Sequence, residues 1–318
     1  MCKAERWGEG GVICSVLGPR RGERQDEMAW YTPWPSVGVR LVLAFLSLCV
    51  VLWAVYRPFS WCGWRYEVIR RGWPVSEVCL MGPEERVTGE VQLPDSFWRG
   101  FTQWRVTEVG AIALAEYINV AGEGPVSVSY KLKKVTLPHQ TRRIGVCAFR
   151  SCRNLETVLL PETLETIGWG AFQFCSSLCE IQFPDSLETI GDSAFEYCTA
   201  LEQIRLPDGL RTVGIYAFGQ CTALKQADLG DGIQGIEYGA FSGCASLESI
   251  RFPDGLKEIG DEAFAGCASL ERIELPKGVK KIGASAFAGC DALQSVTIPK
   301  DCQIGDRAFP AQARIHYR

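Results

Sequence analysis

Residues 250–272 have the sequence IRFPDGLKEIGDEAFAGCASLER, and the next 23 residues, 273–295, have the sequence IELPKGVKKIGASAFAGCDALQS. Apolar residues, a Pro, a Gly and a Cys recur at the same places in both segments. Further copies begin at Val135, Val158, Ile181, Ile204 and Ala227. Seven units of 23 residues therefore fill residues 135–295, and a shortened unit begins at Val296. A repeat of this length is typical of a solenoid, in which each unit forms one coil.

The pattern within one unit predicts how the coil is built. Apolar and polar residues alternate around Ile250, which indicates a short strand. Pro253 has no N–H group and ends this strand, and Asp-Gly then turns the chain. Leu256–Gly260 predicts a second extended piece, and the segment around Phe264 predicts a helical or 3₁₀ turn. One such coil has too few inward residues to fold alone, so neighbouring coils must share a core.

A degenerate unit precedes the regular ones. The segment VQLPDSF begins at Val91, and VTEVGAIALAEY begins at Val106; together they preserve the apolar pattern but lack the Cys. Val91 lies 44 residues before Val135. Insertions of about nine residues around 98–105 and about twelve around 121–131 account for the excess.

The motif FPDGLKEIGDEAFAGCASLERI, residues 252–273, resembles the BspA-like (treponemal-type) leucine-rich repeat family, with Phe252 at a Leu position. The resemblance covers residues 135–318 strongly. It implies a repeat solenoid of 23-residue coils, with short parallel strands on the concave face and short extended or 3₁₀ segments on the other side. It also implies a protein-interaction or adhesin role, and it brings no catalytic residues with it.

One unit departs from the pattern. It has Ala227 where most units have Ile or Val, Gly230 where they have Pro, and Glu237 where they have Gly. We therefore expect a local irregularity, with faster hydrogen exchange across residues 227–240 than in the flanking coils.

Seven of the fifteen cysteines occupy one position of the unit. They are Cys152, Cys175, Cys198, Cys221, Cys244, Cys267 and Cys290. Equivalent residues of stacked coils lie about 4.8 Å apart with parallel side chains, whereas a disulfide needs Cβ atoms about 3.8 Å apart that point at each other. A zinc site needs four converging ligands. We therefore expect buried, reduced thiols that bond to backbone groups.

The segment Leu41–Tyr56 contains 16 uncharged, mostly apolar residues between Arg40 and Arg57. It predicts a transmembrane or signal-anchor helix over residues 41–57 that follows an N-terminal tail, 1–40. A cleaved signal peptide and a helix packed inside a soluble protein are the alternatives. Residues 1–40 carry six Lys and Arg and residues 57–71 carry four, which favours repeats outside the cytoplasm. A start at Met28 would remove residues 1–27 and reverse this orientation.

Residues 58–134 predict a Trp-rich N-terminal cap that includes the degenerate repeat, followed by the solenoid over 135–318. Trp61, Trp64 and Trp73 would cover the open end of the core. An aromatic-lined ligand site in 58–134, with the repeats as a docking arm, is the alternative.

The strand positions that alternate with the inward residues predict the binding face. One column contains Gln182, Arg205, Asp228, Arg251 and Glu274. Variable side chains on a constant scaffold are how solenoids recognise proteins. A solvated sheet face whose charges neutralise one another is the alternative.

Composition excludes several functions. The chain has a net charge of −4, and residues 135–318 carry 17 Lys and Arg against 23 Asp and Glu, which disfavours nucleic acid as a partner. Only two histidines are present, and no phosphate-binding loop or hydrolase motif occurs. We expect a protein of the bacterial cell envelope that is not an enzyme, has no cofactor or metal, and binds a protein partner. A soluble intracellular scaffold is the alternative.

Overall fold

The computed structural model describes residues 59–61, 64–70, 75–83, 89–99, 102–110, 117–120, 124–127 and 132–318. Side chains are described for 90–96, 105–110 and 132–318. The predicted tail 1–40, the predicted membrane segment 41–57 and Trp73 lie outside the described residues. The side chains of Trp61 and Trp64 do so too.

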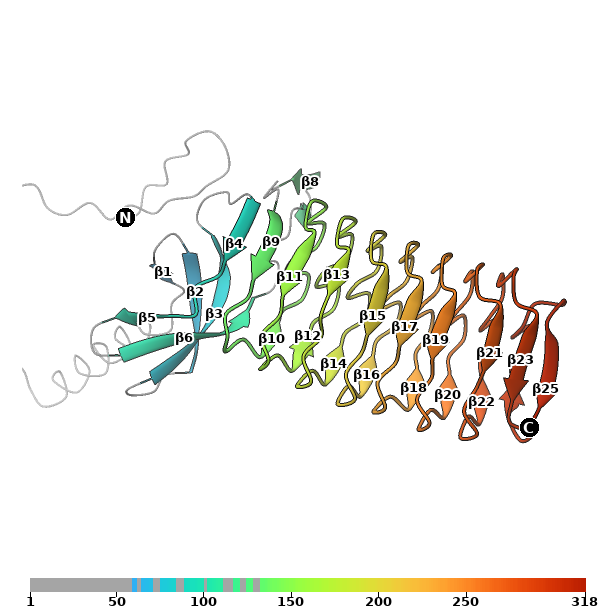
Figure 1. Cartoon of the computed structure of the whole chain (residues 1–318). Coiled ribbons are helices and arrows are strands. Elements are labelled where there is room, and N and C mark those ends of the chain that lie inside the picture. Colours follow the sequence, from blue (N-terminus) through green and yellow to red (C-terminus); the bar gives the residue numbers. More distant parts are fainter. Residues whose placement is uncertain are drawn as a thin grey trace, which may run out of the picture. The chain divides into compact units, whose positions relative to one another are not determined.

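Two rows of short strands run through stacked coils (Figure 1). The first row contains β4 (Gly89–Gln92), β9 (Leu132–Thr136), β11 (Thr157–Leu159), β13 (Glu180–Ile181), β15 (Gln203–Arg205), β17 (Gln226–Asp228), β19 (Ser249–Arg251), β21 (Arg272–Glu274), β23 (Ser295–Ile298) and β25 (Arg314–Tyr317). The second contains β6 (Thr102–Val109), β10 (Arg143–Ile144), β12 (Thr166–Ile167), β14 (Thr189–Ile190), β16 (Thr212–Val213), β18 (Gly235–Ile236), β20 (Glu258–Ile259), β22 (Lys281–Ile282) and β24 (Gln303–Ile304).

Pairing within both rows is parallel, and its register follows the sequence period. Val135 pairs with Val158 in the first row, and Ile190 pairs with Val213 in the second, each 23 residues apart. The described residues contain no helix. The predicted repeat solenoid with 23-residue coils is therefore confirmed.

A column of phenylalanine rings forms the centre of the core. Eight rings, one per coil from Phe149 to Phe309, stack with centroids 5.1–5.4 Å apart and interplanar angles of 2–10°. All but the terminal Phe309 are fully buried. Offset stacking of this kind adds about 0.5–1.5 kcal/mol per pair to the burial of the rings.

The segment that carries these rings forms turns that also join the coils. In the coil of Phe149, the N–H of Arg150 donates to the carbonyl of Cys147 across a tight turn, at 3.1 Å. The N–H of Phe149 instead donates to the carbonyl of Ala171 in the next coil, at 2.8 Å. Because alternate N–H groups bond between coils, the turns do not merge into a helix.

The seven periodic cysteines are buried and are not joined in disulfides. From Cys175 to Cys290, each thiol donates to the carbonyl of the phenylalanine 26 residues earlier, in the preceding coil, at 3.1–3.4 Å. Burial raises the pKa of the Cys198 thiol and raises that of Cys244 to about 12. The predicted ladder of reduced thiols bonded to backbone groups is confirmed.

The irregular coil interrupts the second row. Between β16 and β18 the strands do not pair, whereas β18 pairs with β20. Glycines stand at the position of Glu237 in the other coils, and a Cβ on Gly214 or Gly260 would lie 2.4 or 2.8 Å from the backbone of the preceding coil. Glu237 carries such a Cβ, which holds its coil away from the previous one. The first row runs unbroken through Ala227, so the irregularity is confined to the second row.

The first row is interrupted twice, between β13 and β15 and between β19 and β21. Each gap follows a coil in which Phe183 or Phe252 replaces the usual Leu. The ring of Phe183 lies edge-on to Phe195 of its own coil and to Phe218 of the next coil, with centroids 5.5 and 6.4 Å apart. A ring wedged between two coils separates their strands.

The degenerate unit forms part of the stack. Val91 of β4 pairs with Val135, and Val109 of β6 pairs with Ile144, in the register of the regular coils. The antiparallel strands β1 (Phe59–Trp61), β2 (Trp64–Arg70) and β3 (Val75–Pro83) extend the second row through the parallel pairing of β3 with β6. Two further hairpin pairings involve β5 (Ser96–Arg99) with β6, and β7 (Tyr117–Val120) with β8 (Gly124–Ser127). The division into a cap, 58–134, and a solenoid, 135–318, stays a prediction.

Candidate functional site

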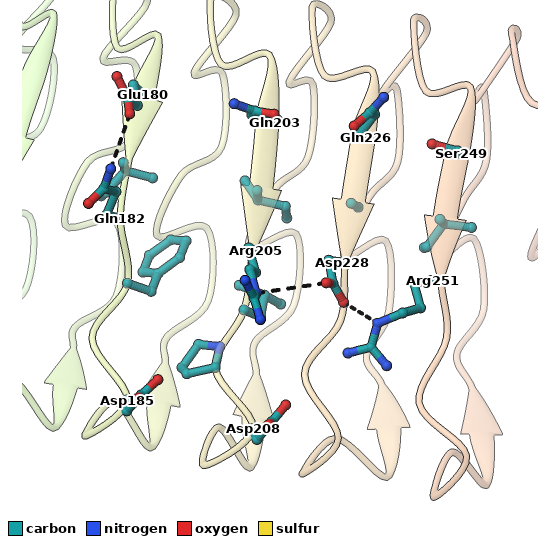
Figure 2. A pocket seen from close by; sticks show the side chains of 17 residues that line it. Glu180, Gln182, Asp185, Gln203, Arg205, Asp208, Gln226, Asp228, Ser249 and Arg251 are labelled. Carbon is teal, nitrogen blue, oxygen red and sulfur yellow. Dashed lines mark hydrogen bonds and ion pairs between the residues drawn. The ribbon is translucent and has the colours of Figure 1, made fainter.

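A groove of about 940 Å³ lies over β13, β15, β17 and β19 (Figure 2), and we call it the strand groove. A smaller hollow of about 460 Å³ over β11 and β13 shares Glu180, Phe183 and Asp185 with it. The gap after β13 lies within the strand groove, because the facing residues Ile181 and Ile204 both line it. The Phe183 wedge therefore helps to form the groove.

The structure brings together four of the five residues predicted for binding. Gln182, Arg205, Asp228 and Arg251 all line the strand groove. The side chains of Arg205, Asp228 and Arg251 follow one another across adjacent strands, as Figure 2 shows. Their role in binding stays a prediction.

Glu274 lies apart from these four residues. It belongs to β21, beyond the second gap in the first row, and does not line the groove. Its carboxylate accepts a hydrogen bond from Arg318 Nη1 at 2.5 Å. Glu274 lies in the strand β21, as predicted, but its carboxylate pairs with Arg318 instead of facing the groove.

Arginine and aspartate side chains form ion pairs in the middle of the groove. Arg251 Nε donates to Asp228 at 2.5 Å, and its Nη1 donates to Asp231 at 2.9 Å. These hydrogen bonds to Asp231 and Asp228 raise the pKa of the Arg251 guanidinium. Arg205 is held more weakly, since its Nε lies 3.9 Å from Asp228 and its side chain is 89% exposed. Arg205 is therefore the more accessible of the two cations.

Uncharged polar side chains line the opposite side of the groove. Gln203, Gln226 and Ser249 stand at equivalent places on adjacent strands and are exposed. Next to them, Gln182 Nε2 donates to the carboxylate of Glu180 at 3.3 Å. Figure 2 shows this row on the far side of the arginines from Asp185 and Asp208. Such groups donate and accept hydrogen bonds.

An acidic row follows the turn after each first-row strand, and we call it the acidic rim. It consists of Glu162, Asp185, Asp208, Asp231 and Asp254, which occupy one position in five consecutive coils and are exposed. The sequence interpretation treated these carboxylates as turn residues, so it missed the row. The signal was present, because the residue after Pro is acidic in four of these coils and Asp follows Gly230 in the fifth.

The sequence interpretation also missed an apolar edge on the turn side. Val146, Trp169, Ile215 and Tyr238 are 36–45% exposed and occupy one position of the unit. Arg150 lies 5.8 Å from the centroid of the Trp169 ring. The signal was the residue after the unit's Gly position, which is apolar or aromatic in four of the five units that begin at residues 135 to 227 and is Asp192 in the fifth.

Other chemical features are few in the described part of the chain. It contains no group of three or more His, Cys, Asp or Glu residues that could hold a metal ion. Among these same residues, no helix is long and apolar enough to span a membrane. The expectations of no catalysis, no cofactor and no metal stay predictions.

The family described as "BspA type Leucine rich repeat region (6 copies)" matches residues 126–231 and 189–316, which together are more than half of the chain. The chain belongs to this family. The resemblance inferred from the repeat motif is thereby confirmed. Leucine-rich repeats of this type are binding scaffolds, which is consistent with a protein-interaction module.

Solved structures show the same fold. A leucine-rich repeat protein from Bacteroides ovatus is 25% identical, with a TM-score of 0.61 and coverage of 81% of this chain and 70% of that chain. The T. pallidum leucine-rich repeat protein is 27% identical, with a TM-score of 0.56 and coverage of 67% of this chain and 91% of that chain. No curated protein matches the chain.

Proposed function

We propose that the chain is a non-enzymatic protein-interaction module that docks a partner protein in the strand groove. The observation that carries this proposal is the groove itself. It crosses four strands of the repeat scaffold and is lined by side chains that differ from coil to coil, such as Gln182, Arg205 and Asp228. A constant backbone with variable outward residues is the means by which solenoids select partners.

A steric block tests this site without assuming the partner's charge. Gln226 is exposed on the uncharged side of the groove, so Gln226→Trp would obstruct that side. Thr212→Trp places the same ring at an exposed position of the second row and is the matched control. A partner captured with the full chain is purified and titrated against both variants. We expect Gln226→Trp to weaken binding about tenfold or more and Thr212→Trp to leave it unchanged. Equal binding by both variants would exclude the groove as the site.

We also propose that the protein is anchored in the bacterial cell envelope through residues 41–57, with the repeats outside the cytoplasm. The support for this is the uncharged, apolar sequence Leu41–Tyr56 between two arginines. Membrane fractionation of the full chain and of a chain lacking residues 28–57 tests it. The full chain should sediment with membranes, and the shortened chain should stay in the supernatant. Recovery of both chains in the supernatant would refute the anchor.

A further inference from the structure

We propose that the strand groove takes an extended, positively charged segment of the partner protein. This inference deepens the proposed function and rests on it. The groove provides the binding surface, and its net negative charge favours a positively charged ligand. Its unpaired backbone groups favour an extended chain.

The charge of the groove is negative once its internal pairs are counted. The groove and the adjoining hollow are lined by five carboxylates and two guanidinium groups, so their lining has a net charge of −3. Both guanidinium groups already face Asp228. Arg251 also binds Asp231, a carboxylate of the rim. The cations are therefore committed to carboxylates within the site.

The remaining carboxylates have no cation of their own. Within the described residues, no Lys or Arg nitrogen lies within 4.0 Å of Glu162, Glu180, Asp185 or Asp208. Asp185 and Asp208 project from neighbouring coils on one side of the groove, as Figure 2 shows. Like charges on adjacent coils repel each other, and a cationic ligand relieves that repulsion. Lysine side chains suit such a row because their stems are flexible.

The floor of the groove offers backbone groups as well as charges. In the described structure, no backbone hydrogen bond joins residues 180–183 to residues 203–206, although both stretches line the groove. Backbone N–H and C=O groups are strong donors and acceptors. A segment that crosses the groove can bond to these groups where it passes the gap between β13 and β15. The Phe183 wedge, which keeps these two strands apart, therefore leaves hydrogen-bonding capacity inside the site.

Other occupants fit less well. A nucleic acid or an acidic peptide would meet a net negative lining and the acidic rim. A sugar is bound on exposed aromatic faces, and the one aromatic residue of the lining, Phe183, is packed against the core. The basic, extended polypeptide is the class that satisfies both the charges and the backbone.

Calorimetric titration of the full chain with three synthetic octapeptides tests the inference. The peptides alternate Thr with Lys, with Glu or with Ser, because Thr favours extended backbone. Eight extended residues reach about 26 Å, enough to cross the four strands of the groove. We expect the Lys peptide to bind, with affinity that falls as salt rises, and the Glu and Ser peptides to bind at least about tenfold more weakly.

Two groove variants should shift affinity for the Lys peptide in opposite directions. Asp185→Asn with Asp208→Asn should weaken binding about fivefold or more. Arg205→Gln, which removes an exposed cation, should strengthen it about twofold or more. The matched controls change the same charges on the second-row side: Glu188→Gln with Glu258→Gln, and Arg211→Gln. They should leave binding unchanged, and thermal melts should show that all variants stay folded.

The outcomes separate the inference from the proposed function. If the Glu or Ser peptide binds as tightly as the Lys peptide, or if no peptide binds, the basic-segment inference is overturned. Equal weakening by the groove and control carboxylate variants would overturn it too, because attraction to the whole acidic surface would then explain binding. The groove as a protein site would still stand or fall on the Gln226→Trp comparison.

Discussion

Replacing Glu237 by Gly should repair the interrupted second row. Among the described residues, two inter-coil bonds of the neighbouring interfaces have no counterpart here: the N–H of Gln234 to the carbonyl of Arg211, and the N–H of residue 237 to the carbonyl of Val213. The interfaces on both sides have the equivalent bonds, for example Lys257 N–H to Gln234 at 2.8 Å and Gly260 N–H to Ile236 at 2.7 Å. Removing the Cβ at 237 takes away the atoms that hold the coils apart.

The expected gain follows from these two bonds. Each contributes about 1 kcal/mol net, whereas Gly in an ordered strand costs about 0.5–1 kcal/mol of backbone entropy relative to Ala. Glu237→Gly should therefore raise the free energy of unfolding by about 1 kcal/mol. Glu237 is exposed and makes no ion pair within the described residues, so little else is lost.

Urea unfolding and amide hydrogen exchange measure this effect. The amides of residues 234 and 237 should exchange more slowly in Glu237→Gly than in the parent. Glu258→Gly is the matched control, because Glu258 is exposed in β20, where the row is already paired. That control should lose about 0.5–1 kcal/mol. If Glu237→Gly destabilises the protein as much as the control does, and exchange at 234 and 237 is unchanged, the Cβ does not cause the break.

Three other outcomes are expected. In the parent protein, the amides of 234–237 should exchange faster than those of 226–228, whose strand is paired on both sides; equal protection would contradict the break. Because burial raises the pKa of Cys244 from 9.0 to about 12, the folded state retains this proton where the unfolded state releases it. The contribution of this thiol to stability is therefore complete below pH 9 and should be lost progressively as the pH rises from 9 towards 12. Urea titrations should show a shallower fall for Cys244→Ala, and an identical fall would refute the linkage. Cys221→Ser should destabilise the fold by about 1–3 kcal/mol in urea unfolding. The thiol lies 3.3 Å from the Phe195 carbonyl, and the shorter C–O bond of Ser places the hydroxyl farther from it. An unchanged midpoint would mean that the hydroxyl still bonds to this carbonyl.

The fold could be predicted from the repeat because the length of the repeat, 23 residues, is also the offset between paired residues of adjacent strands. Once Val135 and Val158 are recognised as equivalent, parallel pairing of their strands follows, and so does the stacking of Phe149 on Phe172. The cysteine ladder was predictable for the same reason, because equivalent thiols with parallel side chains cannot form disulfides with one another. Periodicity also revealed the degenerate unit at Val91, although its Cys is missing.

The groove could not be predicted in this way. Phe183 is a conservative replacement of Leu in the sequence, and nothing there indicates that its ring reaches Phe218 of the next coil. The pairing of Arg251 with Asp231 as well as with Asp228 likewise depends on the direction of its side chain, which the sequence does not show. The importance of Glu237 was visible as a departure from Gly, but its effect on the second row required the distance to the preceding coil.

The three gaps in the strand rows have a mechanical consequence, because no interface is open in both rows. Where β13 and β15 separate, β14 and β16 remain paired, and where β16 and β18 separate, β15 and β17 remain paired. We call such an interface a hinge: the paired row and the bonds between the turns hold its two coils together, and bending opens the unpaired row. Successive hinges open on alternate rows, so bending at one is directed differently from bending at the next. Bending at the β13–β15 hinge would widen or narrow the strand groove. The affinity of the groove for a bound segment would then depend on how far the stack is bent.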